Sequence, residues 1–364
     1  MLVVKRGYQQ TEKFPLVTSN EMLDNVIDMC LFASVIVNFS NIKDCEKQSA
    51  EHLTWQYNCK SQCPSQYPWE NPKIQSKNIN LECKYKMLEN VQSFMFNDTC
   101  FSREVDLKCP DTNLVPNIVH YVWLGDRKQF EFYNFLSVYS VYKFQKPCVI
   151  LFHGETLPYG PYWEKTLTIV KNLIHVYRHA PATIYNKKII HIEHKADILF
   201  VLFSEYGGIY LDTDTILIRS LDTLRGYKYS MSMTRDNTLG NGLILSSKNA
   251  EFVNIWLSKY ISFNPKKWGE HSVYLPYNLS LIHTNLIHVE NRTFLHGGTL
   301  DQIFMSNFKW NRLFALHLYI RYYTKCIYNE NTIEGLNTTL GSVARHVLFD
   351  SKELCTRTRK GSVE

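Results

Sequence analysis

One short segment, "GGIYLDTD", constrains this chain more than any other, because two aspartates follow an apolar run directly. Residues 209–211 have the pattern of a buried strand, and the two glycines before them favour a helix cap and a close backbone approach. Alternation along a strand places Asp212 and Asp214 on one side, at the carboxyl end of that strand. Two neighbouring carboxylates repel, and one proton or a divalent cation relieves the repulsion. The pair therefore predicts a site of hard oxygen ligands, which suits Mg²⁺ or Mn²⁺.

The surrounding sequence alternates between strand and helix patterns. β-branched and aromatic runs predict strands at 117–125, 147–154, 173–181, 209–212, 241–247 and near 315–319. Apolar residues at helical spacing predict helices over 132–144, 193–208 and 250–261. This order is typical of an α/β fold with right-handed crossovers and a parallel sheet. In such sheets ligands bind at the carboxyl ends of the strands, which is where the two aspartates fall.

Length and composition set the domain organisation. The chain has 364 residues, 45% of them hydrophobic, which is enough for one large domain with an appendage. We expect an N-terminal tail (1–39), a Cys-rich stem (40–112), the main domain (113–350) and a C-terminal tail (351–364). The formal charge of +6 is scattered, without the block of like charge that a nucleic-acid-binding arm has. No nucleic acid is therefore expected as a partner.

The cysteines indicate an oxidising compartment. Six of them fall before the first strong fold signal and predict an irregular stem tied by disulfides: Cys45, Cys59, Cys63, Cys83, Cys100 and Cys109. Their pairing stays open. Cys326 and Cys355 are expected to form a further bridge, which leaves Cys30 and Cys148 over. The alternative is a zinc site at "CKSQC" with His52, but no second ligand pair follows it.

The N-terminal region raises the question of a membrane anchor. Residues 29–37, "MCLFASVIV", are apolar but shorter than the ~20 residues that span a bilayer. They predict either a degenerate anchor, preceded by basic residues, or a short buried or interfacial segment. Five Asn-x-Ser/Thr sequons agree with a secretory route, and we expect the Golgi lumen: Asn38, Asn97, Asn278, Asn291 and Asn337.

Several motifs together resemble a known family. They include "VPNIVHYVWLGD", "HVYRHAPATIY", "EHKADILFVLFSEYGGIYLDTDTILIRSLD", "LGNGLILSSKNAEFVNIW" and "FALHLYIRYY". They are similar to the DxD-containing glycosyltransferases of family 32, which include α-1,4-galactosyltransferases. The resemblance implies a GT-A-like, Rossmann-type fold that binds a nucleotide sugar, usually a UDP-sugar, with Mn²⁺ or Mg²⁺. It also implies transfer of a hexose, with retention of anomeric configuration, to a glycan, glycolipid or glycoprotein acceptor.

The resemblance also implies a role for each matching residue. Asp212 would contact ribose or sugar hydroxyls, Asp214 would bind the metal, and His317 would complete the metal or diphosphate site. Tyr121 and Trp123 would flank the nucleotide base. The remaining matches are Asp197 at the donor sugar, Gly208 at a close backbone approach, and Asn241 with Gly242 on the acceptor side. The candidate sets are thus catalytic (Asp197, Asp212, Asp214, Asn241), cofactor-binding (Tyr121, Trp123, Asp197, Gly208, Asp212) and metal (Asp212, Asp214, His317).

One position departs from the family pattern and keeps a second interpretation open. Phe200 stands three residues after Asp197, where the family has arginine. Loss of a charge-assisted contact of that kind costs ~1.5 to 3 kcal/mol. The alternative function is therefore a weak or inactive pseudo-glycosyltransferase that binds nucleotide sugar or glycan. A phosphatase interpretation of "DTDT" requires a later pair of aspartates, which is missing from the sequence.

Overall fold

The structure is a computed structural model. It describes residues 56–58, 86–88, 90–96, 98–124, 128–192, 194–195, 205–234, 238–267, 269–291, 300–322, 327–354 and 356–358. All of these residues belong to one compact unit, Glu51–Glu364. The predicted anchor at 29–37 lies outside the described residues. So do most of the predicted helix 193–208, with Asp197 and Phe200, and the pair Cys326 and Cys355.

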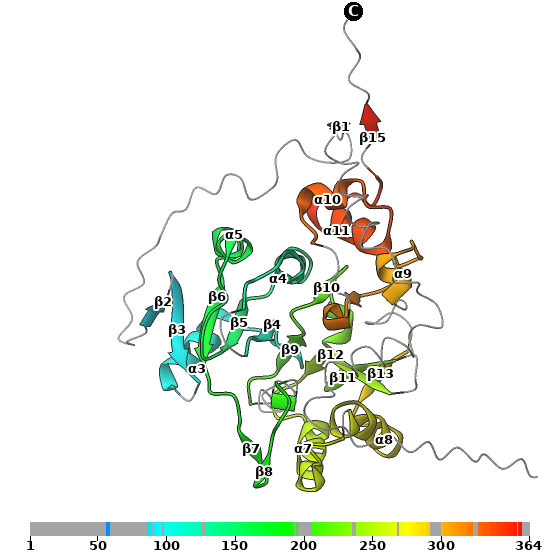
Figure 1. Cartoon of the computed structure of the whole chain (residues 1–364). Coiled ribbons are helices and arrows are strands. Elements are labelled where there is room, and N and C mark those ends of the chain that lie inside the picture. Colours follow the sequence, from blue (N-terminus) through cyan, green and yellow to red (C-terminus); the bar gives the residue numbers. More distant parts are fainter. Residues whose placement is uncertain are drawn as a thin grey trace, which may run out of the picture. The chain divides into compact units, whose positions relative to one another are not determined.

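A nine-stranded sheet forms the centre of this unit (Figure 1). Its strands, in spatial order, are β13 (His288–Glu290), β11 (Tyr229–Met233), β12 (Leu239–Ser246), β9 (Gly208–Leu211), β4 (Ile118–Val122), β5 (Val149–Gly154), β6 (Leu173–Tyr177), β3 (Val91–Met95) and β2 (Lys86–Leu88). The run from β9 to β3 is parallel, whereas β12 is antiparallel to both β9 and β11. The expected α/β architecture with a parallel core is confirmed.

The order of the strands reverses between β4 and β9. From β4 the chain proceeds outward through β5 to β6, and it then returns to place β9 on the other side of β4. Such a reversal leaves a crevice at the carboxyl ends of the two strands. The segment with Asp212 begins directly after β9, so the sheet topology itself places the two aspartates at this position.

Helices cover both faces of the sheet, because strand residues alternate between two hydrophobic clusters on opposite faces. On β5, Ile150 and Phe152 pack with α4 (Phe132–Phe144) and α5 (Pro161–Ile169). Val149 and Leu151 pack with α3 (Thr99–Lys108) instead. Further along that second face, β11 and β12 pack against α7 (Glu251–Ser258) and α8 (Leu275–Ile282). Figure 1 shows α4 and α5 on one side of the strands and α7 and α8 on the other.

The remaining elements extend this arrangement. Two-stranded pairs form between β10 (Thr215–Leu217) and β14 (Ala315–His317), between β7 (Thr183–Ile184) and β8 (Lys187–Lys188), and between β1 (Gln56–Asn58) and β15 (Thr356–Thr358). The last of these joins the predicted C-terminal tail to a strand before the sheet. The other helices are η2 (Asp222–Leu224), η3 (Lys259–Ser262), η4 (Glu270–Tyr274), α9 (Leu300–Phe304), η5 (Ile320–Tyr322), α10 (Glu330–Glu334) and α11 (Thr339–Phe349).

The predicted irregular stem is wrong for its C-terminal part. Between 86 and 108 the described residues include β2, β3 and α3, and β3 pairs in parallel with β6. Val91 packs in the cluster around α4, whereas Phe94 packs against Phe101 of α3. The main sheet therefore begins before residue 113, where we predicted its boundary.

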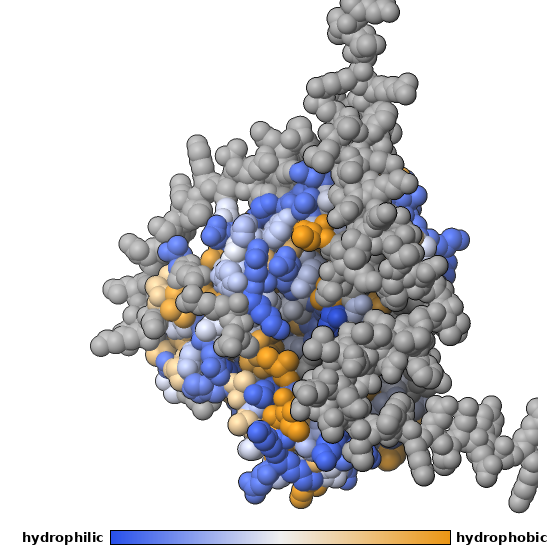
Figure 2. Space-filling view, in the orientation of Figure 1, coloured by the Kyte–Doolittle hydropathy of each residue, from blue (hydrophilic) through white to orange (hydrophobic). Residues whose placement is uncertain are grey.

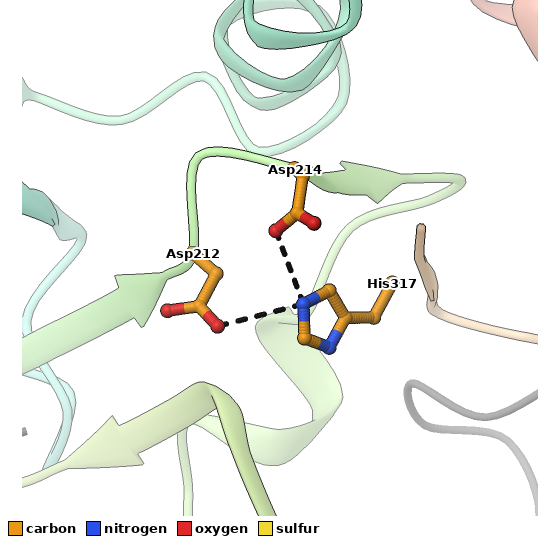
Figure 3. A group of neighbouring side chains, drawn as sticks. All are labelled: Asp212, Asp214 and His317. Carbon is orange, nitrogen blue, oxygen red and sulfur yellow. Dashed lines mark hydrogen bonds and ion pairs between the residues drawn. The ribbon is translucent and has the colours of Figure 1, made fainter. Parts of the chain in front are cut away.

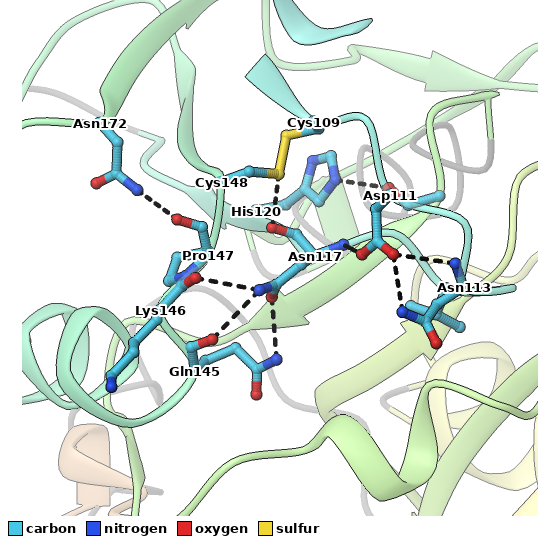
Figure 4. The surroundings of a disulfide bond; sticks show 12 residues. Cys109, Asp111, Asn113, Asn117, His120, Gln145, Lys146, Pro147, Cys148 and Asn172 are labelled. Carbon is cyan, nitrogen blue, oxygen red and sulfur yellow. Dashed lines mark hydrogen bonds between the residues drawn. A yellow bond between two sulfur atoms is a disulfide. The ribbon is translucent and has the colours of Figure 1, made fainter. Parts of the chain in front are cut away.

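A disulfide ties this early segment to the sheet (Figure 4). Cys109, the residue after α3, is bonded to Cys148, the residue before β5. The prediction that Cys148 is left over is therefore wrong. The backbone N–H of Cys148 donates to the Asn117 carbonyl (3.0 Å), and the Asn117 N–H donates to Asp111 (3.0 Å). Cys100 is disulfide-bonded as well.

Two buried histidines lie beneath the start of β9. The Nε2–H of His120 donates to the Gly207 carbonyl (2.9 Å), which leaves Nδ1 to accept from Nε2 of His153 (3.1 Å). Gly208 makes this arrangement possible: it has φ +124°, and a Cβ there would lie 2.7 Å from Nε2 of His120. Burial above all lowers the pKa of His120 to about 4, so the ring is neutral near pH 7.

Among the helices that the structure describes, none combines the length and the apolar character that a bilayer crossing requires.

Removal of the disulfide will destabilise the fold. In the chain-entropy account, a bridge across 39 residues contributes about 4 kcal/mol. The double variant Cys109→Ser, Cys148→Ser should therefore lose a large part of that free energy of unfolding in urea titrations, with secondary structure retained in far-UV circular dichroism. A double variant as stable as the wild type would contradict this role.

Acid will destabilise the fold through His120. An unfolded histidine takes up a proton below about pH 6.5, whereas His120 in the fold resists protonation down to about pH 4. Stability from this residue is therefore complete above pH 6.5 and is lost as the pH falls. Between pH 7 and pH 5 the loss is about 2 kcal/mol. Between pH 7 and pH 5, His120→Gln should therefore lose about 2 kcal/mol less unfolding free energy than the wild type. His179→Gln, which alters an exposed ring, should lose as much as the wild type.

Candidate metal and donor site

The two aspartates lie in a tight turn between strands. β9 ends at Leu211 and β10 begins at Thr215, with the Thr215 N–H donating to the Asp212 carbonyl (2.9 Å). The Asp212 N–H donates in turn to the Gly242 carbonyl of β12 (2.9 Å). The strand alternation that we used to predict a shared side therefore does not apply beyond Leu211. The turn nevertheless brings both carboxylates to one place (Figure 3).

A histidine from a distant part of the chain completes the group. β14 pairs antiparallel with β10 and sets His317 opposite Thr215. Its Nε2 lies 3.0 Å from Oδ1 of Asp214 and 3.5 Å from Oδ2 of Asp212. One ligand atom from each of the three side chains lies within 4.8 Å of the others. The structure thus assembles the three residues that the sequence predicted as metal ligands.

Each carboxylate is oriented by a hydrogen bond to its other oxygen. The Tyr210 hydroxyl donates to Oδ1 of Asp212 (2.6 Å), and the backbone N–H of Ile320 donates to Oδ2 of Asp214 (2.9 Å). The oxygens left over are those that face His317. Such fixed orientation keeps a binding geometry ready before a cation arrives.

The charges of the group act strongly on one another. Burial, together with the nearby charge of Asp214, raises the pKa of Asp212. For Asp214, burial alone would raise the pKa, but the charge and hydrogen bond of His317 outweigh it and lower the pKa. Burial opposes a proton on His317, yet the two carboxylates raise its pKa. A proton on Nε2 and a divalent cation are therefore alternative ways to neutralise the same pair.

Gly242 provides the space for this convergence. A Cβ at this position would lie 2.9 Å from Cε1 and Nδ1 of His317, and 3.0 Å from Oδ2 of Asp212. Real Cβ contacts are almost never so short, so a larger residue would displace the imidazole or the carboxylate. The glycine predicted on the acceptor side thus has a packing role at the metal group.

The other predicted residues lie in different surroundings. Tyr121 is fully buried in the core, and its hydroxyl lies 3.1 Å from Oγ of Ser137, so it has no surface for a nucleotide base. Trp123 is 9% exposed and packs on Phe130. Asn241 is half-buried in β12 beside Gly242. Gly208 packs against β4, as described above. Asp197 and Phe200 lie outside the described residues.

Sequence reasoning missed four neighbours of the group. Tyr210 orients Asp212. Tyr319 has its ring centroid 3.9 Å from that of His317 and holds φ at +51°, a value that side chains seldom adopt. The positive charge of Arg321 acts on Asp212, His317 and Tyr319. Burial, then the charge of Asp214, raises the pKa of Tyr133 to about 12. The sequence offered one signal for Tyr210, Tyr319 and Arg321, which is that they lie within a few residues of Asp212 or His317. Tyr133 is distant from both in the sequence.

Substitution of Gly242 will separate the packing role from general effects on the fold. Gly242→Ala should weaken Mn²⁺ binding about tenfold or more in calorimetric titration, because the added methyl displaces His317 or Asp212. Gly226→Ala is the matched control, since a Cβ there meets nothing within 4 Å. Equal Mn²⁺ affinity in Gly242→Ala and the wild type would show that the three side chains do not act as one ligand set.

A family match covers the segment around the aspartates. Residues 154–231 match the family described as "Glycosyltransferase sugar-binding region containing DXD motif". The chain is also 33% identical over 233 residues to glucan organizing enzyme 1 of Cryptococcus neoformans var. grubii. That alignment covers 56% of this chain and 62% of the relative, so the chain spans less than two thirds of the relative's length.

Solved structures of glycosyltransferases show weak likenesses to this chain. The PaToxG glycosyltransferase is 17% identical, with 51% of this chain and 75% of that chain covered at a TM-score of 0.35. Mouse xyloside xylosyltransferase 1 is 10% identical, with 50% and 87% covered at a TM-score of 0.36. TM-scores this low carry no argument about function. The family match covers residues 154–231, and it agrees with the resemblance found in the sequence at the segment that holds Asp212 and Asp214.

Proposed function

We propose that this protein is a metal-dependent, retaining glycosyltransferase that moves a hexose from a UDP-sugar to a glycan, glycolipid or glycoprotein acceptor. The observation that carries the proposal is the convergence of Asp212, Asp214 and His317 at the strand-order reversal. The two aspartates lie in the segment that matches a DXD-type region. Ligands of α/β sheets bind at such reversals. The carboxylate pair is thus located where a nucleotide-bound donor can reach it.

The ligand set fits a divalent cation. Two carboxylates and one imidazole, each offering an atom within 4.8 Å of the others, suit Mn²⁺, and Mg²⁺ is the alternative. Asp214 and His317 would hold the ion, with Asp212 beside them. Once bound, a divalent cation neutralises the charge that a diphosphate leaving group develops.

Residues around the group would bind and orient the donor. Asp212, held by Tyr210, would accept hydrogen bonds from ribose or sugar hydroxyls. Arg321 adds a positive charge at the same place, which favours an anionic diphosphate. Tyr133, whose pKa is raised to about 12, keeps its proton near pH 7 and can donate a hydrogen bond to a phosphate oxygen. A retaining front-face reaction needs no protein nucleophile, since a departing phosphate oxygen can act as the base.

Two further expectations remain part of the proposal. A secretory compartment, with the Golgi lumen as our assignment, is supported by the Cys109–Cys148 disulfide, since such bonds persist in oxidising surroundings. A glycan as acceptor is supported by the relative whose name refers to glucan.

A second candidate is a pseudo-glycosyltransferase that binds a nucleotide sugar without turnover. Phe200 favours it, because the family places arginine there. A guanidinium donates several hydrogen bonds that a phenyl ring cannot supply. The basic residues that would have to supply these hydrogen bonds in place of the missing arginine are Arg178, Lys195 and Arg219.

Turnover of UDP-sugars will test the proposal. Purified protein with Mn²⁺ should release UDP from at least one member of a UDP-sugar panel. Asp214→Asn should lower that rate by at least about a hundredfold, because the variant removes the charge that holds the cation. Asp106→Asn, at an exposed position of α3, is the matched control and should keep the wild-type rate.

The same assay separates the two candidates. Binding of a UDP-sugar without release of UDP, unchanged in Phe200→Arg, would reject the transferase in favour of the pseudoenzyme. A faster release in Phe200→Arg would instead show that the missing arginine limits an active enzyme. Loss of UDP release on chelation of the metal, with recovery on addition of Mn²⁺, would support metal dependence.

A further inference from the structure

The hairpin of β7 and β8 has an unusual tip. Ile184 pairs with Lys187, so Tyr185 and Asn186 form a two-residue turn. Both have positive φ, +45° and +63°, as the favoured hairpin turns require. Glycine and asparagine adopt such values readily, whereas an aromatic side chain there is strained. Tyr185 nevertheless occupies the position and leaves 49% of its surface exposed.

The base of the hairpin is firmly packed, so the tip is held in place. Ile189 is 3% exposed in the cluster around α7, and Ile184 packs against the same cluster. The Lys187 ammonium donates to the carbonyl of Ile261 in η3, which directly follows α7 (2.8 Å). The hairpin therefore cannot relieve the strain at Tyr185 by moving as a whole, because its base is packed and hydrogen-bonded. Strain retained at an exposed aromatic residue indicates a contact outside the fold.

The surroundings of the tip combine apolar and basic side chains. Ile190 and Ile261 are 58% and 64% exposed. Burial lowers the pKa of His271, and the charges of Lys187 and Lys267 lower it further, which places both ammonium groups near one side chain. We name as the hairpin surface the residues Tyr185, Lys187, Lys188, Ile190, Lys259, Ile261, Lys266 and Lys267.

The charged residues of the hairpin surface are all lysines. Along 181–192 and 259–270 the described residues include one acidic side chain, Glu270, which pairs with Lys267 at 2.8 Å. No other acidic side chain is present among the described residues of these two segments to balance the remaining lysines of the hairpin surface. Figure 2 shows hydrophilic and hydrophobic residues side by side over the region where the β7–β8 hairpin lies in Figure 1.

We propose that the hairpin surface binds a membrane that carries anionic lipids, with Tyr185, Ile190 and Ile261 entering the interface and the lysines contacting headgroups. Amphipathic aromatic side chains prefer the level of the headgroups, and neighbouring lysines add attraction to anionic lipids. Two exposed isoleucines favour lipid over a polar glycan, because aliphatic side chains gain most from leaving water. This contact is separate from the predicted N-terminal anchor at 29–37.

Vesicle sedimentation of the full-length protein tests the proposal. Binding to phosphatidylcholine vesicles that contain phosphatidylserine should exceed binding to phosphatidylcholine alone, and salt should reduce the difference. Each lysine contributes about a fivefold gain in partitioning, which corresponds to ~1 kcal/mol. The double variant Lys188→Gln, Lys266→Gln should therefore bind about 25-fold more weakly, whereas the exposed control Lys309→Gln should bind as the wild type does.

Tyr185→Gly provides a test in which stability and binding respond differently. Glycine accepts positive φ, so the melting temperature should stay the same or rise, while vesicle binding weakens by roughly threefold or more. Tyr159→Ser, at another exposed tyrosine, should change neither. The N-terminal segment is identical in all variants, so differences between them isolate the hairpin surface.

Two results would overturn the proposal. If the double lysine variant and Tyr185→Gly both bind anionic vesicles as tightly as the wild type, the hairpin surface does not contact the membrane. Unchanged vesicle binding together with a raised KM for a glycan acceptor would assign the surface to the acceptor instead.

Discussion

The repulsion between the carboxylates of Asp212 and Asp214 is the constraint on which the site depends. Both side chains point to Nε2 of His317, at 3.5 and 3.0 Å, and both are fixed by a hydrogen bond at their other oxygen. Such an arrangement is costly unless a positive charge occupies the space between them. A proton on the imidazole can supply part of that charge, and our proposal assigns a divalent cation to the same place.

The rest of the fold serves to hold this pair in place. β9 delivers the aspartates at the strand-order reversal, and the pairing of β10 with β14 brings His317 across from a distant part of the chain. The absence of a side chain at Gly242 gives the imidazole its room. Behind β9, His120 and His153 form a neutral buried hydrogen-bonded pair that anchors Gly207. Together these contacts bring residues that are distant in the sequence to the site and hold them around the two aspartates.

Sequence reasoning succeeded where the pattern was local. The helix over 132–144 agrees with α4 residue for residue, because its apolar residues recur at helical spacing. The strands at 117–125 and 147–154 were found from their β-branched and aromatic runs, with ends too long by up to three residues. Asp212 and Asp214 were found from their position directly after an apolar strand pattern. His317 was found through the family resemblance, which encodes three-dimensional proximity that a single sequence does not.

Sequence reasoning failed where the position or pairing of a residue depends on tertiary contacts. β3 escaped notice because its partner β6 lies about 80 residues later, and because the cysteine-rich surroundings suggested an irregular stem. Cys148 was left unpaired for the same reason. Tyr121 was assigned to the nucleotide because a strand pattern does not tell which face meets α4. Tyr133 and Arg321 join the site only after the chain has folded.

Anomalous diffraction at the manganese absorption edge, from crystals grown with Mn²⁺ and UDP, tests the central claim most directly. The account predicts one anomalous peak bonded to the Asp214 carboxylate and to Nε2 of His317, with Asp212 at its side and UDP phosphate oxygens on the opposite side. A peak at other residues, or Asp212 and Asp214 turned into separate surroundings with UDP bound elsewhere, would contradict it.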